Sequence, residues 1–177
     1  MIGAERKDSR EKRGDVLFLD RRDCMSNIWM RVMIAAYRGI PIIVESLDGM
    51  VEKTAMGAFY YAGNGTATYD NIIDTTDRKV RLLNFLTLAD RATDALEDDL
   101  KMLVKKRIEG ITFEKIAKEM EWSMRNIFRL YEIALTSMRK YLDINGYNGE
   151  WMDTYWGADN YLGQIYSRLK ANEISAA

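Results

Sequence analysis

The sequence predicts an all-α fold, and three observations support this prediction. Proline occurs once in 177 residues, residues that favour helices dominate, and apolar residues recur at helical spacing in several stretches. Apolar residues make up 47% of the chain, which is enough for a hydrophobic core in one domain or slightly more. We expect an N-terminal helical hairpin or bundle, then a helix-turn-helix unit, then an aromatic-rich helical tail.

The composition excludes several classes of function. A formal charge of -1 and an isoelectric point near 5.7 argue against a protein that coats nucleic acid indiscriminately. The chain has no histidine and a single cysteine, Cys24, which excludes the usual metal centres, histidine-based catalytic arrangements and an internal disulfide. It also lacks an apolar run of membrane-spanning length and a signal peptide. We therefore expect a cytoplasmic protein with no cofactor, no catalytic role and no membrane contact.

The first half divides into a flexible charged tail, residues 1–15, and an N-terminal helical domain, residues 16–95. Residues 5–13 hold five basic and three acidic side chains and nothing apolar, a composition that favours disorder. A basic arm that contacts phosphate is the alternative interpretation of this segment.

Two helices are predicted at the start of the helical domain. Apolar residues at helical spacing indicate a helix over residues 24–38, and Pro41 suits the first turn of a second helix over residues 41–61. We expect these two helices to form an antiparallel hairpin. Glycine weakens a helix interior by about 1 kcal/mol, so Gly49 and Gly57 predict a kink or break in the second one.

A mobile loop is predicted over residues 62–75, which begin with the run AGNGTATYDN. The next helix should open at Thr76 or the residue after it. Acidic residues favour a break within residues 93–98, because negative charge stabilises the N-terminus of a helix, here a new one over residues 100–108.

The helix-turn-helix unit is predicted over residues 96–142. Its first helix follows Gly110, with the hydroxyl of Thr112 as the N-cap, and Ser123 caps a longer second helix that reaches about Leu142. At about 100° per residue, the second helix has an apolar face and a polar, basic face. From Ser123 to Leu142 the chain carries four basic residues and one acidic residue, a local net charge of +3.

This region resembles region four of bacterial sigma factors, and its setting is similar to that of phage transcriptional regulators of the RinA and ArpU type. The residues that carry the resemblance are Gly110, Ile111, Thr112, Phe113, Glu114, Lys115, Ile116, Ala117, Met120, Ser123, Ile127, Ala134, Leu135 and Met138. It implies a DNA-binding protein of the bacterial cytoplasm or nucleoid, with RNA polymerase as a further partner. Upstream, nothing resembles sigma region two, so a complete sigma factor is not expected.

Two residues of the turn depart from the family pattern. Glu121 stands where the family often has glycine, so a positive φ there would cost on the order of 1 kcal/mol. Trp122 replaces a smaller aliphatic residue, which implies a larger pocket behind the turn.

Residues 143–177 form the aromatic-rich C-terminal tail, which carries a local charge of -3 and ends in a predicted helix. Large aromatic side chains are rarely left in water. The tail therefore either packs back on the N-terminal helices or contacts another chain, and a homo-oligomer follows from the second alternative.

The predicted DNA contacts lie mainly on the second helix of the unit. Arg125 and Arg129 would meet guanine edges or phosphates, and Met124 and Phe128 would meet thymine methyl groups. The expected phosphate and backbone contacts are Thr112, the Ser123 amide, Arg139, Lys140, Lys105 and Lys106. For each cation the alternative is an ordinary surface role, such as pairing of Arg129 with Glu132 or of the lysines with the end of their own helix.

Three functions are compatible with this pattern. The first is a sequence-specific regulator of transcription that binds double-stranded DNA through the major groove. The second is a phage small terminase subunit, which also joins a helix-turn-helix to helical oligomerisation segments. The third is a protein-binding module built on a degenerate helix-turn-helix, with which an exposed Phe128 would be compatible.

Overall fold

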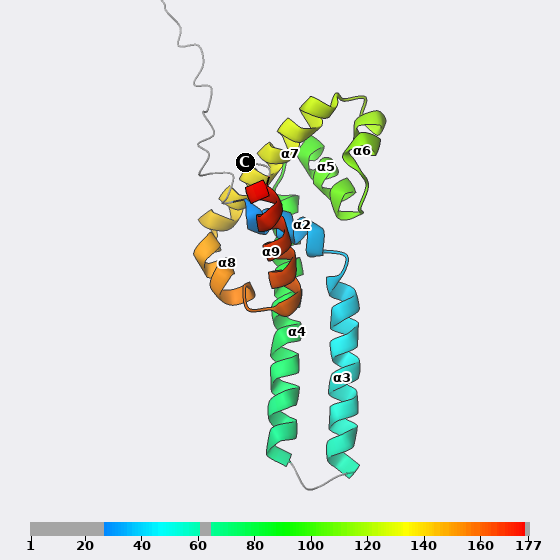
Figure 1. The fold of residues 1–177 in the computed structure, drawn as a ribbon, viewed down its shortest axis with the longest axis vertical. Helices are drawn as coiled ribbons and strands as arrows, with labels where there is room; N and C mark the ends of the chain where they lie inside the picture. The colour runs from blue at the N-terminus through cyan, green and yellow to red at the C-terminus, as the bar shows by residue number, and fades with distance from the viewer. Residues whose placement is uncertain (1–26, 61–64, 176–177) are drawn as a thin grey trace, which may run out of the picture.

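The computed structural model describes residues 27–60 and 65–175 of the chain (Figure 1). All regular structure in these ranges is helical, which confirms the all-α fold class. The helices are α2 (Ile28–Ala36), α3 (Ile40–Tyr60), α4 (Gly65–Asp94), α5 (Asp98–Ile108), α6 (Phe113–Glu119), α7 (Met124–Ile144), α8 (Gly149–Trp156) and α9 (Asn160–Ser175). The predicted charged tail over residues 1–15 and Cys24 lie outside the described residues.

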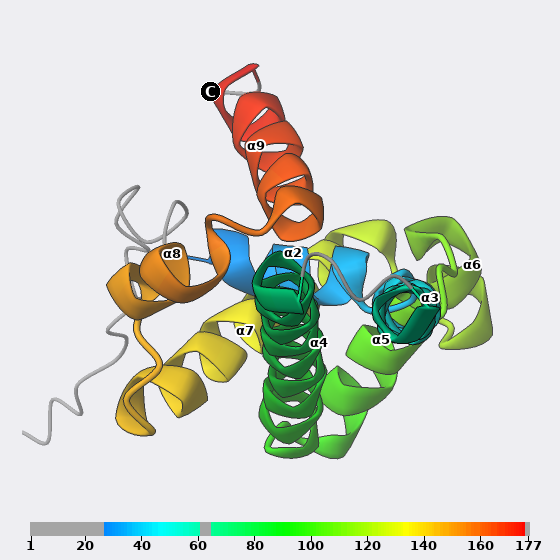
Figure 2. The same ribbon diagram turned by 90° about the horizontal axis from the view of Figure 1, so that it is seen from below.

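The short helix α2 lies at the centre of the molecule. Seven of its nine residues are buried, and Val32, Met33 and Ala36 are completely inaccessible. It packs against α4, α5, α7 and α9, and Figure 2 shows it enclosed by the surrounding helices. A helix that is apolar on most sides needs burial on most sides, and in α2 only Arg31 and Ala35 are not buried.

The antiparallel hairpin is made by α3 and α4. Its far end projects from the rest of the protein in Figure 1, while the C-terminal half of α4 belongs to the main core. The predicted pairing of α2 with α3 is therefore wrong, because the apolar surface of α2 is covered by other helices. Pro41 lies in the first turn of α3, as expected. The predicted break at Gly49 or Gly57 is absent from α3, which is one helix over residues 40–60.

The predicted loop over residues 62–75 is also corrected by the structure. Helix α4 begins at Gly65, eleven residues before the expected start at Thr76, and residues 61–64 lie outside the described part. Local composition favours a turn here, but packing of α4 along α3 overrides that weak preference.

Helices α5, α6 and α7 surround a small apolar cluster made of Leu103, Ile116, Ala117 and Ile127. The predicted break before α5 is confirmed, since α4 ends at Asp94 and α5 begins at Asp98. Trp122 packs half-buried against the cluster, behind the turn between α6 and α7. The inner sides of α5 and α7 also contribute to the main core, so this unit is continuous with the rest of the protein.

The C-terminal tail packs back on the N-terminal helices, which was one of the two alternatives. Trp156 of α8 is fully buried, with its ring edge-on to Phe85 of α4 at a centroid distance of 4.8 Å. Trp29 of α2 donates a hydrogen bond from Nε1 to Asp153 Oδ1 at 2.7 Å, and α9 packs along α2. None of the helices in the described ranges combines the length and apolar character needed to cross a bilayer.

Candidate nucleic-acid interface

The turn between α6 and α7 is held by two side-chain caps. The Thr112 hydroxyl accepts a hydrogen bond from the Lys115 amide at 3.4 Å, and the Ser123 hydroxyl accepts one from the Asn126 amide at 3.2 Å. Both caps are confirmed as predicted. They satisfy amides that have no partner within their own helices, and so they fix where α6 and α7 begin.

Glu121 adopts the left-handed conformation within this turn, with φ of 53°. The chain reverses there so that the Trp122 amide can donate to the Ala117 carbonyl at 3.0 Å. A residue with a Cβ is strained in this region, which is the cost expected from the absence of the usual glycine. The turn thus holds α7 at a defined angle to α6.

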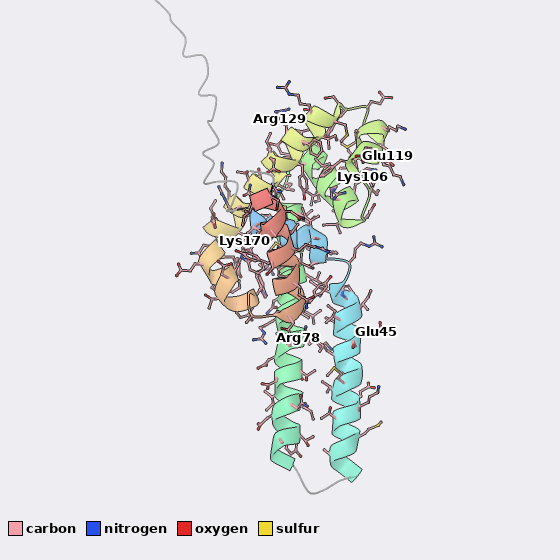
Figure 3. All side chains as sticks on the ribbon, in the orientation of Figure 1. Glu45, Arg78, Lys106, Glu119, Arg129 and Lys170 are labelled. Atoms are coloured by element: carbon pink, nitrogen blue, oxygen red, sulfur yellow. The ribbon has the colours of Figure 1, made fainter. Side chains whose placement is uncertain are left out.

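One face of α7 is buried, but the predicted polar, basic face is exposed mainly over the first two turns. Further along, α2 partly covers that face, since Thr136 accepts a hydrogen bond from Asn27 and Glu132 pairs with Arg31. Ile127, Ala134, Leu135, Met138 and Leu142 are buried among the neighbouring helices. Arg125 and Arg129 are exposed one helical turn apart, and Arg129 lies on the outer side of α7 in Figure 3. Arg129 donates from Nη2 to Asn126 Oδ1 at 3.0 Å. Within the described part of the chain, neither arginine forms an ion pair with a carboxylate.

The predicted surface alternative, a pair between Arg129 and Glu132, is not formed. Glu132 instead accepts from Arg31 of α2 at 2.7 Å, although it lies on the same side of α7 as Arg125, two turns further along. The first two turns of α7 therefore keep their positive charge unneutralised by described acidic side chains. A cationic pair on an accessible helix face can bind phosphate or guanine edges.

An aromatic cluster lies beside these arginines. Phe113 of α6 contacts both Phe128 and Tyr131 of α7, with ring centroids 5.0 and 5.1 Å apart, and the Arg107 guanidinium lies 4.2 Å from the Phe113 centroid. Burial raises the pKa of Tyr131, while the nearby Arg107 charge opposes the shift. Phe128 remains 48% exposed, whereas Met124 is half-buried against the small cluster.

The lysines at the end of α5 have acidic neighbours. Lys106 forms an ion pair with Glu119 of α6, and the two side chains lie together in Figure 3. Lys105 is more exposed, with Nζ 3.9 Å from Asp94 Oδ1. A hydrogen bond from Lys101 and its charge, with a smaller contribution from Lys105, lower the pKa of Asp94. Of the two predicted lysines, Lys105 has the weaker pairing.

Arg139 and Lys140 lie far along α7 and are not brought together with the first pair. The Arg139 side chain is 18% exposed, with Nε 3.9 Å from Asp143 Oδ2. It lines a cavity of about 420 Å³ beside Trp29 and Tyr166, on the side of α2 and α9. Lys140 is exposed. Because a helix rises about 1.5 Å per residue, Lys140 lies roughly 20 Å along α7 from Arg125.

Two further cations were missed by the sequence reasoning. Lys115 and Lys118 are exposed on α6, the helix before the turn. Their three-residue spacing on a short helix places them on neighbouring positions of one face, and that spacing was visible in the sequence. They extend the set of cations close to the turn.

Comparison of the chain with protein-family models, curated proteins and solved structures found no match. We therefore infer function from the geometry of α5, α6 and α7 and from the motif within them.

Proposed function

We propose that this protein is a sequence-specific regulator of transcription that binds double-stranded DNA, with α7 lying in the major groove. The observation that carries the proposal is the pair Arg125 and Arg129, exposed on consecutive turns of a capped helix and free of described carboxylate partners. Recognition rather than catalysis is the proposed role, and RNA polymerase and phage-type regulation are part of the same proposal.

Each side chain near the start of α7 has a role that fits its chemistry. Arg125 and Arg129 can each donate two hydrogen bonds to the O6 and N7 atoms of guanine. The exposed part of Phe128 can contact a thymine methyl group. The first amides of α7, next to Ser123, suit a phosphate, since a helix N-terminus favours anions.

The remaining cations would orient the protein without specifying sequence. Lys105, Lys115 and Lys118 are exposed around the turn, and Thr112 lies at the start of α6. Phosphate contacts release counterions, so affinity should fall as salt concentration rises. The overall charge of -1 means that this attraction is local to α5, α6 and α7.

Selection from random-sequence DNA with the purified protein is the direct test. We expect a defined sequence to emerge, and we expect Arg125→Ala and Arg129→Ala each to weaken binding to it by about 1–3 kcal/mol. Arg168→Ala is the matched control, because Arg168 is an exposed arginine on α9, outside this unit. Unchanged affinity in both α7 variants would show that Arg125 and Arg129 do not contact the DNA and would contradict the proposal.

A second candidate, a protein-binding module, is favoured by one observation. Phe128 exposes 48% of its surface next to Phe113, and exposed aromatic residues are enriched where proteins bind one another. Absence of DNA binding at low salt, together with a stable complex with RNA polymerase that Phe128→Ala weakens, would select this candidate. DNA binding that survives Phe128→Ala but not Arg125→Ala would select the first.

A further inference from the structure

A line of exposed apolar side chains runs along α4 in the projecting hairpin. Tyr69, Ile73, Val80 and Leu83 are 64%, 55%, 48% and 41% exposed, and Thr76 between them is also exposed. Successive members are four, three, four and three residues apart. This is the heptad spacing of a helix that packs against another helix. We call these five residues the α4 stripe.

A second line of residues with the same spacing lies one residue earlier in α4 and already packs within the protein. It consists of residues that are buried or half-buried along α3, namely Thr68, Ile72, Thr75, Lys79 and Leu82. Lys79 bridges to α3 through Asp48, with Nζ and Oδ1 2.5 Å apart. Helix α4 thus carries two adjacent packing lines, and α3 covers only one. A helix with two such lines is suited to a bundle of more than two helices.

The projecting part of the hairpin lacks a core of its own. From Asp48 to Arg81, no side chain whose exposure is described is buried. Most of the stability of a helix in a protein comes from burying one face against other elements. Figure 1 shows this part of α3 and α4 extending beyond the helices that enclose α2. A further helix on the α4 stripe would bury the apolar side chains that α3 leaves in water.

We propose that a second copy of this chain covers the α4 stripe, with the two α4 helices antiparallel. The stripe is nearly symmetric about Thr76: Tyr69 and Leu83 lie seven residues to either side, and Ile73 and Val80 lie three and four. In an antiparallel pair, Tyr69 of one copy therefore packs against Leu83 of the other. A two-fold interface requires such self-complementarity.

Charge favours the same occupant and the same direction. Asp70 precedes Thr76 and Arg81 follows it, and both lie beside the α4 stripe on the same side of the helix. Antiparallel pairing brings Asp70 of one copy near Arg81 of the other, whereas parallel pairing would place each of these residues beside its own copy. Arg78 lies on the opposite side of α4, where it pairs with Asp159 at 2.8 Å, whereas Arg81 is exposed and forms no ion pair within the described ranges.

Sedimentation analysis of the full-length protein without DNA tests the proposal, from about 1 µM to about 1 mM protein. We expect a monomer–dimer equilibrium in which Ile73→Lys with Val80→Lys raises the dissociation constant at least about tenfold. Met56→Lys is the matched control, since Met56 is 65% exposed on α3 but lies outside the stripe. A monomer at all concentrations, a larger ring, or equal effects of both variants would overturn the proposal.

Cysteine cross-linking tests the direction, in a chain where Cys24→Ser has removed the natural thiol. Thr76→Cys lies at the axis and should form a disulfide-linked dimer. Tyr69→Cys should not form one. In the antiparallel pair the two copies of residue 69 lie roughly 20 Å apart, at about 1.5 Å per residue, which is too far for a disulfide. Adding Leu83→Cys to Tyr69→Cys should restore cross-linking. Efficient cross-linking of Tyr69→Cys alone would overturn the antiparallel arrangement.

Asp77 provides an independent check on the position of the two-fold axis. It lies one residue from Thr76, so the two copies of Asp77 would approach each other in the dimer. Asp77→Asn should therefore strengthen association, whereas Asp77→Asn without effect on the dimer would contradict the assigned axis. The dimer is measured in the absence of DNA. Absence of a dimer would therefore not contradict the proposed DNA binding, and absence of DNA binding would not contradict the dimer.

Discussion

Arg31 and Glu132 join the central helix to the candidate reading helix, with Nη2 of the arginine 2.7 Å from Oε1 of the glutamate. Arg31 also lies 3.4 Å from Glu173 of α9, so one guanidinium connects three helices. The side chains of Arg31, Glu132 and Glu173 are 25%, 39% and 18% exposed. This arrangement keeps Glu132 away from Arg129 and leaves the exposed face of α7 cationic.

We expect Arg31→Met to lower the free energy of unfolding by about 1–2 kcal/mol. Removing the guanidinium leaves two carboxylates close together without a counterion, and partial exposure to water keeps the loss below that of a fully buried pair. Urea unfolding followed by circular dichroism measures the change. Arg38→Met is the control, since Arg38 makes an exposed hydrogen bond to the Glu109 carbonyl. Equal losses in the two variants would argue against a special role for the three-helix connection.

Glu121→Gly should stabilise the protein by about 0.5–1 kcal/mol. Glycine adopts the positive φ of 53° without steric cost, although its greater freedom in the unfolded chain offsets part of the gain. Glu121→Ala separates the conformational effect from loss of the charge, because alanine retains the strain. Thermal unfolding of both variants gives the comparison, and a gain in the alanine variant as large as that in the glycine variant would show that charge is responsible.

The caps were predictable because their hydrogen bonds span only three residues. Thr112 and Ser123 both reach amides in the first turns of their own helices. The buried face of α7 was predictable for the same reason, since it follows from helical periodicity. The covering of Thr136 and Glu132 by α2 was not, because it depends on a segment about a hundred residues earlier. The positive φ at Glu121 followed from a position at which the related pattern often has glycine.

The predictions that the structure contradicts concern contacts between distant parts of the chain. Apolar spacing identified the segments that became α2 and α3, but it carries no information on which helix each one packs against. The sequence predicts a loop that includes residues 65–75 because their local preference for helix is weak, and packing against α3 compensates for that weakness. The position of Arg139 beside Trp29 also depends on a segment more than a hundred residues away.

Tyr37 should make stability depend on alkaline pH. Its hydroxyl donates to Asp90 Oδ1 at 2.6 Å, and this bond, burial and the charges of Asp90 and Asp94 raise its pKa to about 12. Because the folded-state pKa lies above the ordinary value near 10, the contribution is complete below about pH 10 and is lost as pH rises through about 12. Unfolding measured across this range should show a shallower decline for Tyr37→Phe than for the unaltered protein. Parallel profiles would exclude Tyr37 as the source.

Trp156→Leu should lower the free energy of unfolding by about 2–4 kcal/mol, because it opens a cavity in the main core. The variant loses the edge-on contact with Phe85 and the hydrogen bond from Nε1 to the Arg81 carbonyl at 3.3 Å. Tyr155→Leu changes the adjacent aromatic residue, which is 37% exposed, and should cost much less. If α8 belongs to the same cooperative unit as α4, chemical denaturation will remain a single transition in both variants. A separate early transition in Trp156→Leu would contradict that.

The enclosed position of α2 constrains the order in which the chain can fold during translation. The helix emerges from the ribosome well before α9, yet its contacts with α9 include Tyr161 donating to the Ala36 carbonyl 125 residues earlier. Until α9 has been made, Trp29, Met33 and their apolar neighbours lack the part of their cover that α9 provides. Exposed apolar segments of nascent chains are aggregation-prone and are the segments that chaperones protect. Synthesis of this protein should therefore depend on such protection until α9 has left the ribosome.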